Sequence, residues 1–141
     1  MSMFFQVKTQ GKIIYIDIVG QWSECEALDF EQTMHSTIPS LNGGKFAHLI
    51  SFEKWGLSTP EVEPIVKRTL AWCVKQGLSI SAEVFTPDAL KEYLLDKSVE
   101  DTKGELIIRR FNNKKVAATW LAEMGYQKVA PLVPVTPSSS Q

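Results

Sequence analysis

Apolar residues occur along the chain in short runs, and between these runs they recur every three or four positions. Residues 3–8 and 12–19 are rich in β-branched and aromatic types, and a three-residue turn ending at Gly11 joins them, which predicts an antiparallel hairpin. The second strand is mostly apolar on both faces, so we expect it in the interior of a sheet. Three later runs predict further strands: residues 45–51, 79–85 and 106–111.

Four segments with the period of an amphipathic helix follow or separate these strands. Ser23 and Glu26 have the spacing of a capping box, and Ser58 and Glu61 repeat it. We expect the helices to begin near these residues: Ser23, Thr59, Pro87 and Asn112. The order ββαβαβαβα predicts an α/β fold with a mixed, mainly parallel five-stranded sheet and four helices, in which the hairpin supplies the antiparallel pair.

The chain has 141 residues, the usual size of one domain. We expect the α/β domain over residues 1–126 and a disordered tail over residues 127–141, which are rich in proline and serine. No apolar run approaches the roughly 20 residues that a membrane span needs. The first eight residues lack the basic and apolar regions of a secretory signal, so we expect a cytoplasmic protein.

Charge and composition argue against nucleic acid as a partner. The net charge is -1, which gives no overall field to attract a phosphate backbone. One basic cluster does occur where the last strand meets the last helix, and we interpret it as a solvated strand end: Arg109, Arg110, Lys114 and Lys115.

We predict no metal and no cofactor. The soft and imidazole ligands are Cys25, Cys73, His35 and His48, and none of them has the spacing of a zinc element. His48, inside a predicted strand, is expected to be a hydrogen-bonded core or edge histidine, and His35 is expected on a helix surface. No G-x-S-x-G turn precedes a helix, so a hydrolase triad has no starting point.

Four features can be compared with known families: the hairpin end Gly20-Gln21-Trp22, the capped first helix, the strand that leads toward Trp55, and the segments Arg110-Phe111-Asn112-Asn113 and Ala117-Ala118-Thr119-Trp120-Leu121. Together they resemble the SpoIIAA-like family, whose fold is related to STAS domains, the anti-sigma factor antagonist modules, and to lipid-binding CRAL-TRIO domains. The resemblance spans about residues 3 to 126. Because it consists of packing patterns, it implies a fold rather than an activity.

The resemblance also points to one candidate modification site. In regulatory STAS proteins, a strand ends in an Asp-Ser-Ser/Thr-Gly turn at a helix N-terminus, and the serine accepts phosphate. The matching place here has the hydroxyls of Ser58 and Thr59 but neither the aspartate nor the glycine. Two interpretations stay open. These residues are helix caps, or they are phospho-acceptors whose phosphate the helix N-terminus stabilises.

The segment of residues 52–57 has no regular period, and we expect it as a loop at the carboxyl edge of the sheet, where ligands of α/β proteins bind. Its large side chains are candidate ligand or partner contacts. Trp55 either anchors the loop to the core or lines a pocket or a partner surface. The candidate contacts are Phe52, Glu53, Trp55 and Leu57.

Three functions follow from these observations. The leading hypothesis is a non-enzymatic binding or regulatory module that forms a homodimer or docks a protein partner through a sheet edge or a helix face. The second is a carrier of a small apolar molecule or lipid, which an enclosed apolar cavity above ~300 Å³ would favour and a tightly filled core would exclude. The third is an enzyme, for which Glu53, Glu83 and Asp17 would be the carboxylates.

Overall fold

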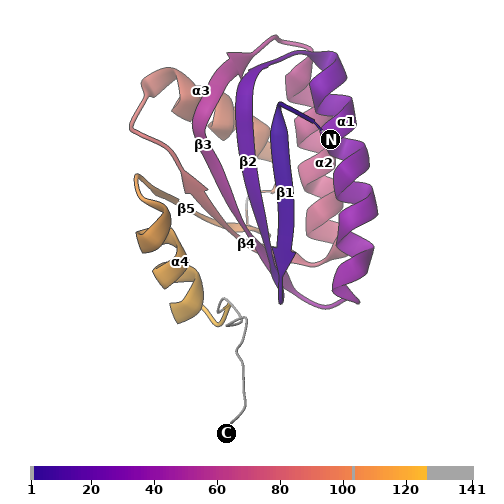
Figure 1. Ribbon diagram of the computed structural model, residues 1–141, viewed down its shortest axis with the longest axis vertical. Helices are drawn as coiled ribbons and strands as arrows, with labels where there is room; N and C mark the ends of the chain where they lie inside the picture. The colour runs from indigo at the N-terminus through magenta and orange to yellow at the C-terminus, as the bar shows by residue number, and fades with distance from the viewer. Residues whose placement is uncertain (1, 103, 127–141) are drawn as a thin grey trace, which may run out of the picture.

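The computed structural model describes residues 2–102 and 104–126 and contains a five-stranded sheet in the order β1-β2-β3-β4-β5 (Figure 1). Strand β1 pairs with β2 in the antiparallel direction, and every other neighbouring pair is parallel. The strands are β1 (Phe5–Gln10), β2 (Ile13–Trp22), β3 (Phe46–Ser58), β4 (Leu78–Val84) and β5 (Ile107–Phe111). The mixed, mainly parallel sheet predicted from the sequence is therefore confirmed.

Four α-helices and two short 3-10 helices complete the described part of the chain. The α-helices are α1 (Glu24–Thr37), α2 (Val62–Gln76), α3 (Ala89–Ser98) and α4 (Lys114–Glu123), and the 3-10 helices are η1 (Ile38–Leu41) and η2 (Glu100–Thr102). None of the helices in this described part is long and apolar enough to cross a membrane.

The strand order decides which face each helix covers. From β2 to β5 each crossover moves to the next strand in the same direction, and right-handed crossovers in one direction place all their helices on one face. Helices α1, α2 and α3 accordingly pack on one face, whereas α4, which follows the last strand, packs on the other (Figure 1). We call the first the three-helix face and the second the α4 face.

Each face has its own hydrophobic core. On the three-helix face, Ile14 and Ile16 of β2 pack with helix residues such as Phe30 and Met34. On the α4 face, Leu49 of β3 and Ile80 of β4 pack with α4 residues, among which Leu121 is completely buried. The apolar side of α4 is not buried throughout, because Val116 and Met124 are exposed.

Three predicted helix starts agree with the structure. At α1, the Glu26 carboxylate accepts hydrogen bonds from the backbone N–H and the hydroxyl of Ser23, at 2.7 and 2.6 Å. Asp88 caps α3 by accepting from Leu90 N–H. Asn113, one of the two asparagines at the predicted start, caps α4 in the same way.

The prediction for residues 52–61 was wrong in two respects. Strand β3 does not end near residue 51 but continues to Ser58, because this part pairs with the end of β2 through two register shifts. Those shifts interrupt the alternation of buried and exposed residues, which hid the strand from the periodicity. The predicted capping box at Ser58 and Glu61 does not form. Thr59 and Pro60 make a turn instead, and α2 begins at Val62.

The hairpin turn also differs from its prediction. Strand β1 runs to Gln10 and β2 begins at Ile13, so the turn has the two residues Gly11 and Lys12 rather than three. Gly11 adopts φ 60°, a left-handed conformation that glycine tolerates without strain. The predicted tail over residues 127–141 lies outside the described residues.

Candidate functional site

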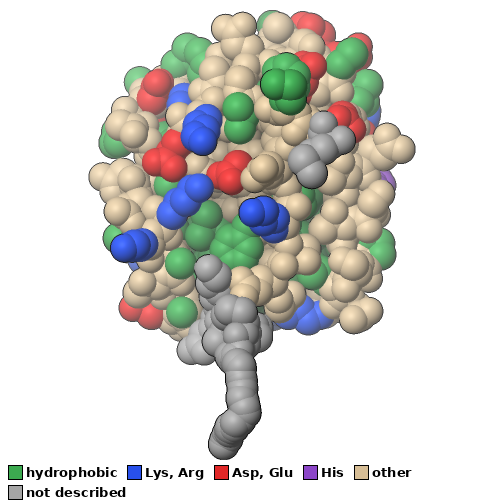
Figure 2. Space-filling view, in the orientation of Figure 1, with side chains coloured by type: hydrophobic (Ala, Val, Ile, Leu, Met, Phe, Trp, Pro, Cys, Tyr) green, Lys and Arg blue, Asp and Glu red, His purple; other side chains and the backbone are tan. Residues whose placement is uncertain are grey.

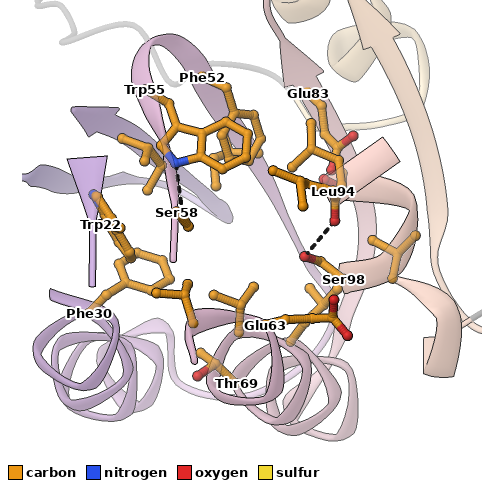
Figure 3. A pocket seen from close by; sticks show the side chains of 18 of the residues that line it. Trp22, Phe30, Phe52, Trp55, Ser58, Glu63, Thr69, Glu83, Leu94 and Ser98 are labelled. Carbon is orange, nitrogen blue, oxygen red and sulfur yellow. Dashed lines mark hydrogen bonds between the residues drawn. The ribbon is translucent and has the colours of Figure 1, made fainter. Parts of the chain in front are cut away.

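A cavity of about 470 Å³ lies between the three-helix face of the sheet and helices α2 and α3 (Figure 3). Strands β3 and β4 form its floor, α2 and α3 form its roof, and Trp22 and Phe30 contribute from β2 and α1. Protein interiors are close-packed, and voids larger than a water molecule are few. A cavity of this size falls instead within the range of small-molecule sites, about 300–1,000 Å³.

The residues of α2 explain why the space stays open. The side chains that α2 directs at the cavity are mostly short or β-branched, such as Val66, Thr69 and Cys73. Its aromatic residue, Trp72, does not point there but stacks on His35 of α1, with ring centroids 3.8 Å apart. Helix α2 therefore rests on the sheet without filling the volume above β3 and β4.

Aromatic side chains surround one end of the cavity. Phe52 and Trp55 of β3 pack with their ring centroids 5.5 Å apart, and Trp22 packs against Phe30 at the same centroid distance. Figure 3 shows the two pairs on either side of the space, with Trp55 Nε1 donating a hydrogen bond to Ser58 Oγ at 3.0 Å. The rings present a rigid apolar wall to whatever occupies the cavity.

The cavity reaches the surface between the start of α2 and helix α3. Thr59 and Pro60 line it and are exposed, and Tyr93 of α3 lines it with 57% of its surface accessible. Glu63 stands at the same end, paired with Lys67 at 3.6 Å. A molecule can therefore enter without passing through the sheet.

Two polar side chains pair with each other on the floor. His48 of β3 and Ser81 of β4 lie in register on neighbouring strands, and His48 Nε2 is 2.6 Å from Ser81 Oγ. Burial lowers the pKa of His48 to about 4, so its imidazole is neutral at physiological pH. Its other ring nitrogen, Nδ1, is buried and has no hydrogen-bond partner in the described part of the chain.

A buried carboxylate lies two residues along β4 from Ser81. Glu83 Oε1 accepts a hydrogen bond from Arg110 Nε at 2.8 Å, and the same guanidinium contacts Asp96 of α3 at 2.8 Å. Burial raises the pKa of Glu83 above its usual range, although Arg110 opposes the shift. Arg110 thus connects the floor of the cavity to α3, and Glu83 contributes a carboxyl group that is already paired.

Two of the four candidate contact residues, Phe52 and Trp55, line the cavity, and so do the two candidate phospho-acceptors, Ser58 and Thr59. Trp55 combines both roles considered for it, because it packs into the core at 8% exposure and also faces the cavity. Glu53 is exposed, and Leu57 is half-buried outside the lining, with a strained φ of 79°.

The sequence did not predict that polar side chains, those of His48, Ser81 and Glu83, lie together on the floor of a cavity. The interpretation of His48 as a fully hydrogen-bonded core histidine is correct for Nε2 and wrong for Nδ1. The signal that could have found the floor is the pattern of β4, where Ser81 and Glu83 alternate with apolar residues in a strand that is buried on both faces. Polar side chains directed inward from such a strand need partners, and a ligand is one source of them.

The other candidate groups do not converge. Asp17 lies on the α4 face, paired with Lys114 at 3.1 Å, whereas Glu83 lies on the three-helix face. Of the basic cluster, Arg110 and Lys114 are thus both engaged with carboxylates. The face of the molecule in Figure 2 carries Lys and Arg beside Asp and Glu rather than a patch of one sign. Residues 2–102 and 104–126 contain no group of three acidic, His or Cys side chains that could hold a metal.

The two cysteines remain separate thiols. Cys25 is exposed on α1, and Cys73 is buried on α2 beside the cavity. Burial raises the pKa of Cys73 to about 12, so this thiol stays protonated and acts as a small apolar side chain.

No model of a known protein family matches the chain, and no curated protein matches it. Solved structures do. An uncharacterised protein of the DUF3478 family with a SpoIIAA-like fold, from Shewanella loihica PV-4, is 13% identical with a TM-score of 0.63 over 83% of this chain and 91% of that one. An anti-sigma factor antagonist from Mycobacterium paratuberculosis is 13% identical with a TM-score of 0.58 over 84% and 92%.

The anti-sigma factor antagonist SpoIIAA in its unphosphorylated form is also similar, with 11% identity and a TM-score of 0.55 over 84% of this chain and 97% of that one. These likenesses show that the chain has a SpoIIAA-like fold, as the sequence resemblance implied. At such identities they establish the fold alone.

Proposed function

We propose that this SpoIIAA-like chain is a non-enzymatic binding module that holds a small, largely apolar molecule between its sheet and helices α2 and α3. The observation that supports the proposal is the cavity of about 470 Å³, which exceeds the ~300 Å³ expected of a small-molecule site. This space supports the carrier hypothesis, because a tightly filled core would have excluded it; the space differs from the enclosed cavity of that hypothesis in that it opens to the surface.

The chemistry of the lining favours an apolar occupant. Aromatic and aliphatic side chains make up most of the wall, and moving apolar surface out of water is favourable by roughly 25 cal/mol per Å². Most of the polar groups on the wall are paired with the protein. For an uncharged aromatic ligand we expect a Kd between about 1 and 100 µM.

Binding can be tested with the neutral fluorescent probe N-phenyl-1-naphthylamine, whose emission rises in apolar surroundings. Val66→Trp places a large side chain in the cavity and should abolish the increase, because the volume is then occupied. Val116→Trp makes the same change at an exposed position on α4 and should leave binding intact. If wild type gives no saturable signal, or if both variants bind equally well, the proposal is wrong.

A second candidate is a regulatory module that acts on a protein partner. It is supported by the fold shared with two anti-sigma factor antagonists. Exposed apolar side chains on α3, Leu90 and Tyr93, and the edge strand β5 are surfaces for a partner or a homodimer. Pulldown from the native host followed by native mass spectrometry distinguishes the candidates. A stoichiometric protein partner favours the second, and a retained small molecule favours the first.

Phosphorylation of Ser58 or Thr59 belongs to this second candidate. Thr59 is exposed, whereas Ser58 is half-buried with its hydroxyl accepting from Trp55, so Thr59 is the more accessible acceptor. Mass spectrometry of residues 51–64 from the native host would detect the added phosphate. Its absence across growth conditions would remove this hypothesis.

A further inference from the structure

One buried polar atom of a residue that lines the cavity has no hydrogen-bond partner in the described part of the chain. Ser58 accepts from Trp55, Thr69 donates to the carbonyl of Ile65 at 2.8 Å, and Ser98 donates to the carbonyl of Leu94. His48 Nδ1 differs from these hydroxyls. It is the one buried side-chain nitrogen or oxygen in the described part of the chain for which no partner is found, on a residue that is 94% buried.

The state of His48 limits what can bind there. A neutral imidazole has one N–H donor and one acceptor nitrogen, and its tautomer follows the bond that the other nitrogen makes. If Nε2 donates to Ser81, Nδ1 is an acceptor. If Ser81 donates to Nε2, Nδ1 carries the proton. A hydroxyl group satisfies Nδ1 in either tautomer, because it both donates and accepts.

The charges around the cavity disfavour an ionised ligand. Glu63 and Glu83 line it, and among the described residues no lysine or arginine does. A carboxylate or phosphate in the cavity would lose its hydration and meet carboxyl groups without a cation in the wall, which is unfavourable. An ammonium group would lose hydration too, and the buried carboxylate of Glu83 is already paired with Arg110.

We propose, building on the binding function above, that the cavity selects an apolar molecule with one uncharged hydroxyl group, and that this hydroxyl hydrogen-bonds to His48 on the floor. The cavity follows β3 from His48, near the start of the strand, to Ser58 at its end, where the surface opening lies. The hydroxyl therefore occupies the inner end and the apolar part points toward the opening. A chain-like alcohol fits this arrangement.

Competition against the neutral probe tests the selectivity with molecules of similar length: decan-1-ol, methyl nonyl ether, decanoate and decylamine. For each protein, the preference for the alcohol is the ether concentration that displaces half of the probe divided by the alcohol concentration that does so. The preference in wild type is then compared with that in a variant, because the free energy of transferring each molecule from water is the same for both proteins and cancels. His48→Phe keeps an aromatic ring and removes both nitrogens. We expect the relative preference for the alcohol to fall about tenfold in this variant, as for the loss of one buried hydrogen bond.

A matched control lies outside the cavity. Thr119→Val removes a hydroxyl from the exposed side of α4, whose bond to the carbonyl of Lys115 is local, and should leave the alcohol preference unchanged. Decanoate and decylamine should compete at least tenfold less well than decan-1-ol in wild type. Circular dichroism of each variant shows that it is folded.

The wild-type protein offers a second readout that needs no substitution. The chain has two histidines. His35 is exposed and stacks on Trp72 outside the cavity lining, so its ring serves as an internal reference. Adding decan-1-ol to protein with ¹⁵N-labelled histidine should shift the His48 Nδ1 resonance and leave that of His35 in place.

The outcomes separate the two proposals. If the probe binds but all four competitors act alike, if His48→Phe keeps the alcohol preference, or if the His48 resonance does not move on binding, the hydroxyl selectivity is wrong and the binding function stands. If the probe and every competitor fail to bind, both are wrong. A stronger competition by decanoate or decylamine would assign the cavity to a charged ligand instead.

Discussion

Acidification should destabilise this protein through His48, and the effect can be isolated with one substitution. His48 is buried at 6% exposure on the floor of the cavity, and no carboxylate of the described residues pairs with its ring. Charging such a ring inside the fold is unfavourable because the imidazolium loses its hydration. In His48→Phe this contribution is absent, so the two proteins should respond differently to pH.

The sign and size follow from the pKa of His48, which is 6.5 ordinarily and about 4 in the folded chain. Between these values the unfolded chain binds more protons than the folded one, so the free energy of unfolding rises with pH and falls as the pH is lowered. The contribution lost at pH 5 is about 2 kcal/mol relative to pH 8. At still lower pH the loss approaches about 3 kcal/mol.

Urea unfolding followed by tryptophan fluorescence gives the required free energies for wild type and His48→Phe at pH 8, 6.5 and 5. Other groups titrate in both proteins, so the difference between the two free energies is the quantity to compare. It should shift by about 2 kcal/mol in favour of the variant between pH 8 and pH 5. A difference that does not change with pH would show that His48 titrates normally and is not buried as described.

Three further substitutions test individual contacts of the fold, each by urea unfolding. Arg110→Met leaves Glu83 unpaired and should cost about 3 kcal/mol at pH 7. The loss should become smaller as the pH is lowered, because burial raises the pKa of Glu83 and protonation removes the unpaired charge; a loss that does not change with pH would contradict this. Gly77→Ala places a Cβ 2.3 Å from the Gly44 carbonyl oxygen at φ 123° and should cost about 3 kcal/mol, whereas a neutral result would refute the close approach. Ser23→Ala should cost about 1 kcal/mol, and no loss would mean that the cap is dispensable.

The fold could be predicted because its signals are local. Glycines, caps and periodicity marked most element boundaries. The placement of α1, α2 and α3 on one face was not predicted, because it depends on the strand order that the structure gives. The prediction failed at residues 52–61, where strand pairing with β2 outweighs local preference. Ser58 was expected to cap a helix, but its hydroxyl is used by Trp55 while the residue is still in β3.

Only part of the candidate site could be predicted from the sequence. Phe52 and Trp55 could be singled out as large aromatics near a strand end, and both line the cavity. The pairing of His48 with Ser81 depends on the register between β3 and β4, and these residues are 33 positions apart. The cavity itself arises from what α2 leaves unfilled, which is a property of three-dimensional packing and has no signature in a single segment.

Binding inside the cavity is tested most directly by a crystal structure of the protein soaked with 10-bromodecan-1-ol. The bromine gives an anomalous signal that locates the apolar end without reference to side-chain positions. We expect a single peak between β3 and α2 on the side of Trp55, with ligand density leading to His48. Side chains that fill this space, or bromine bound only on the outer surface, would contradict the proposed function.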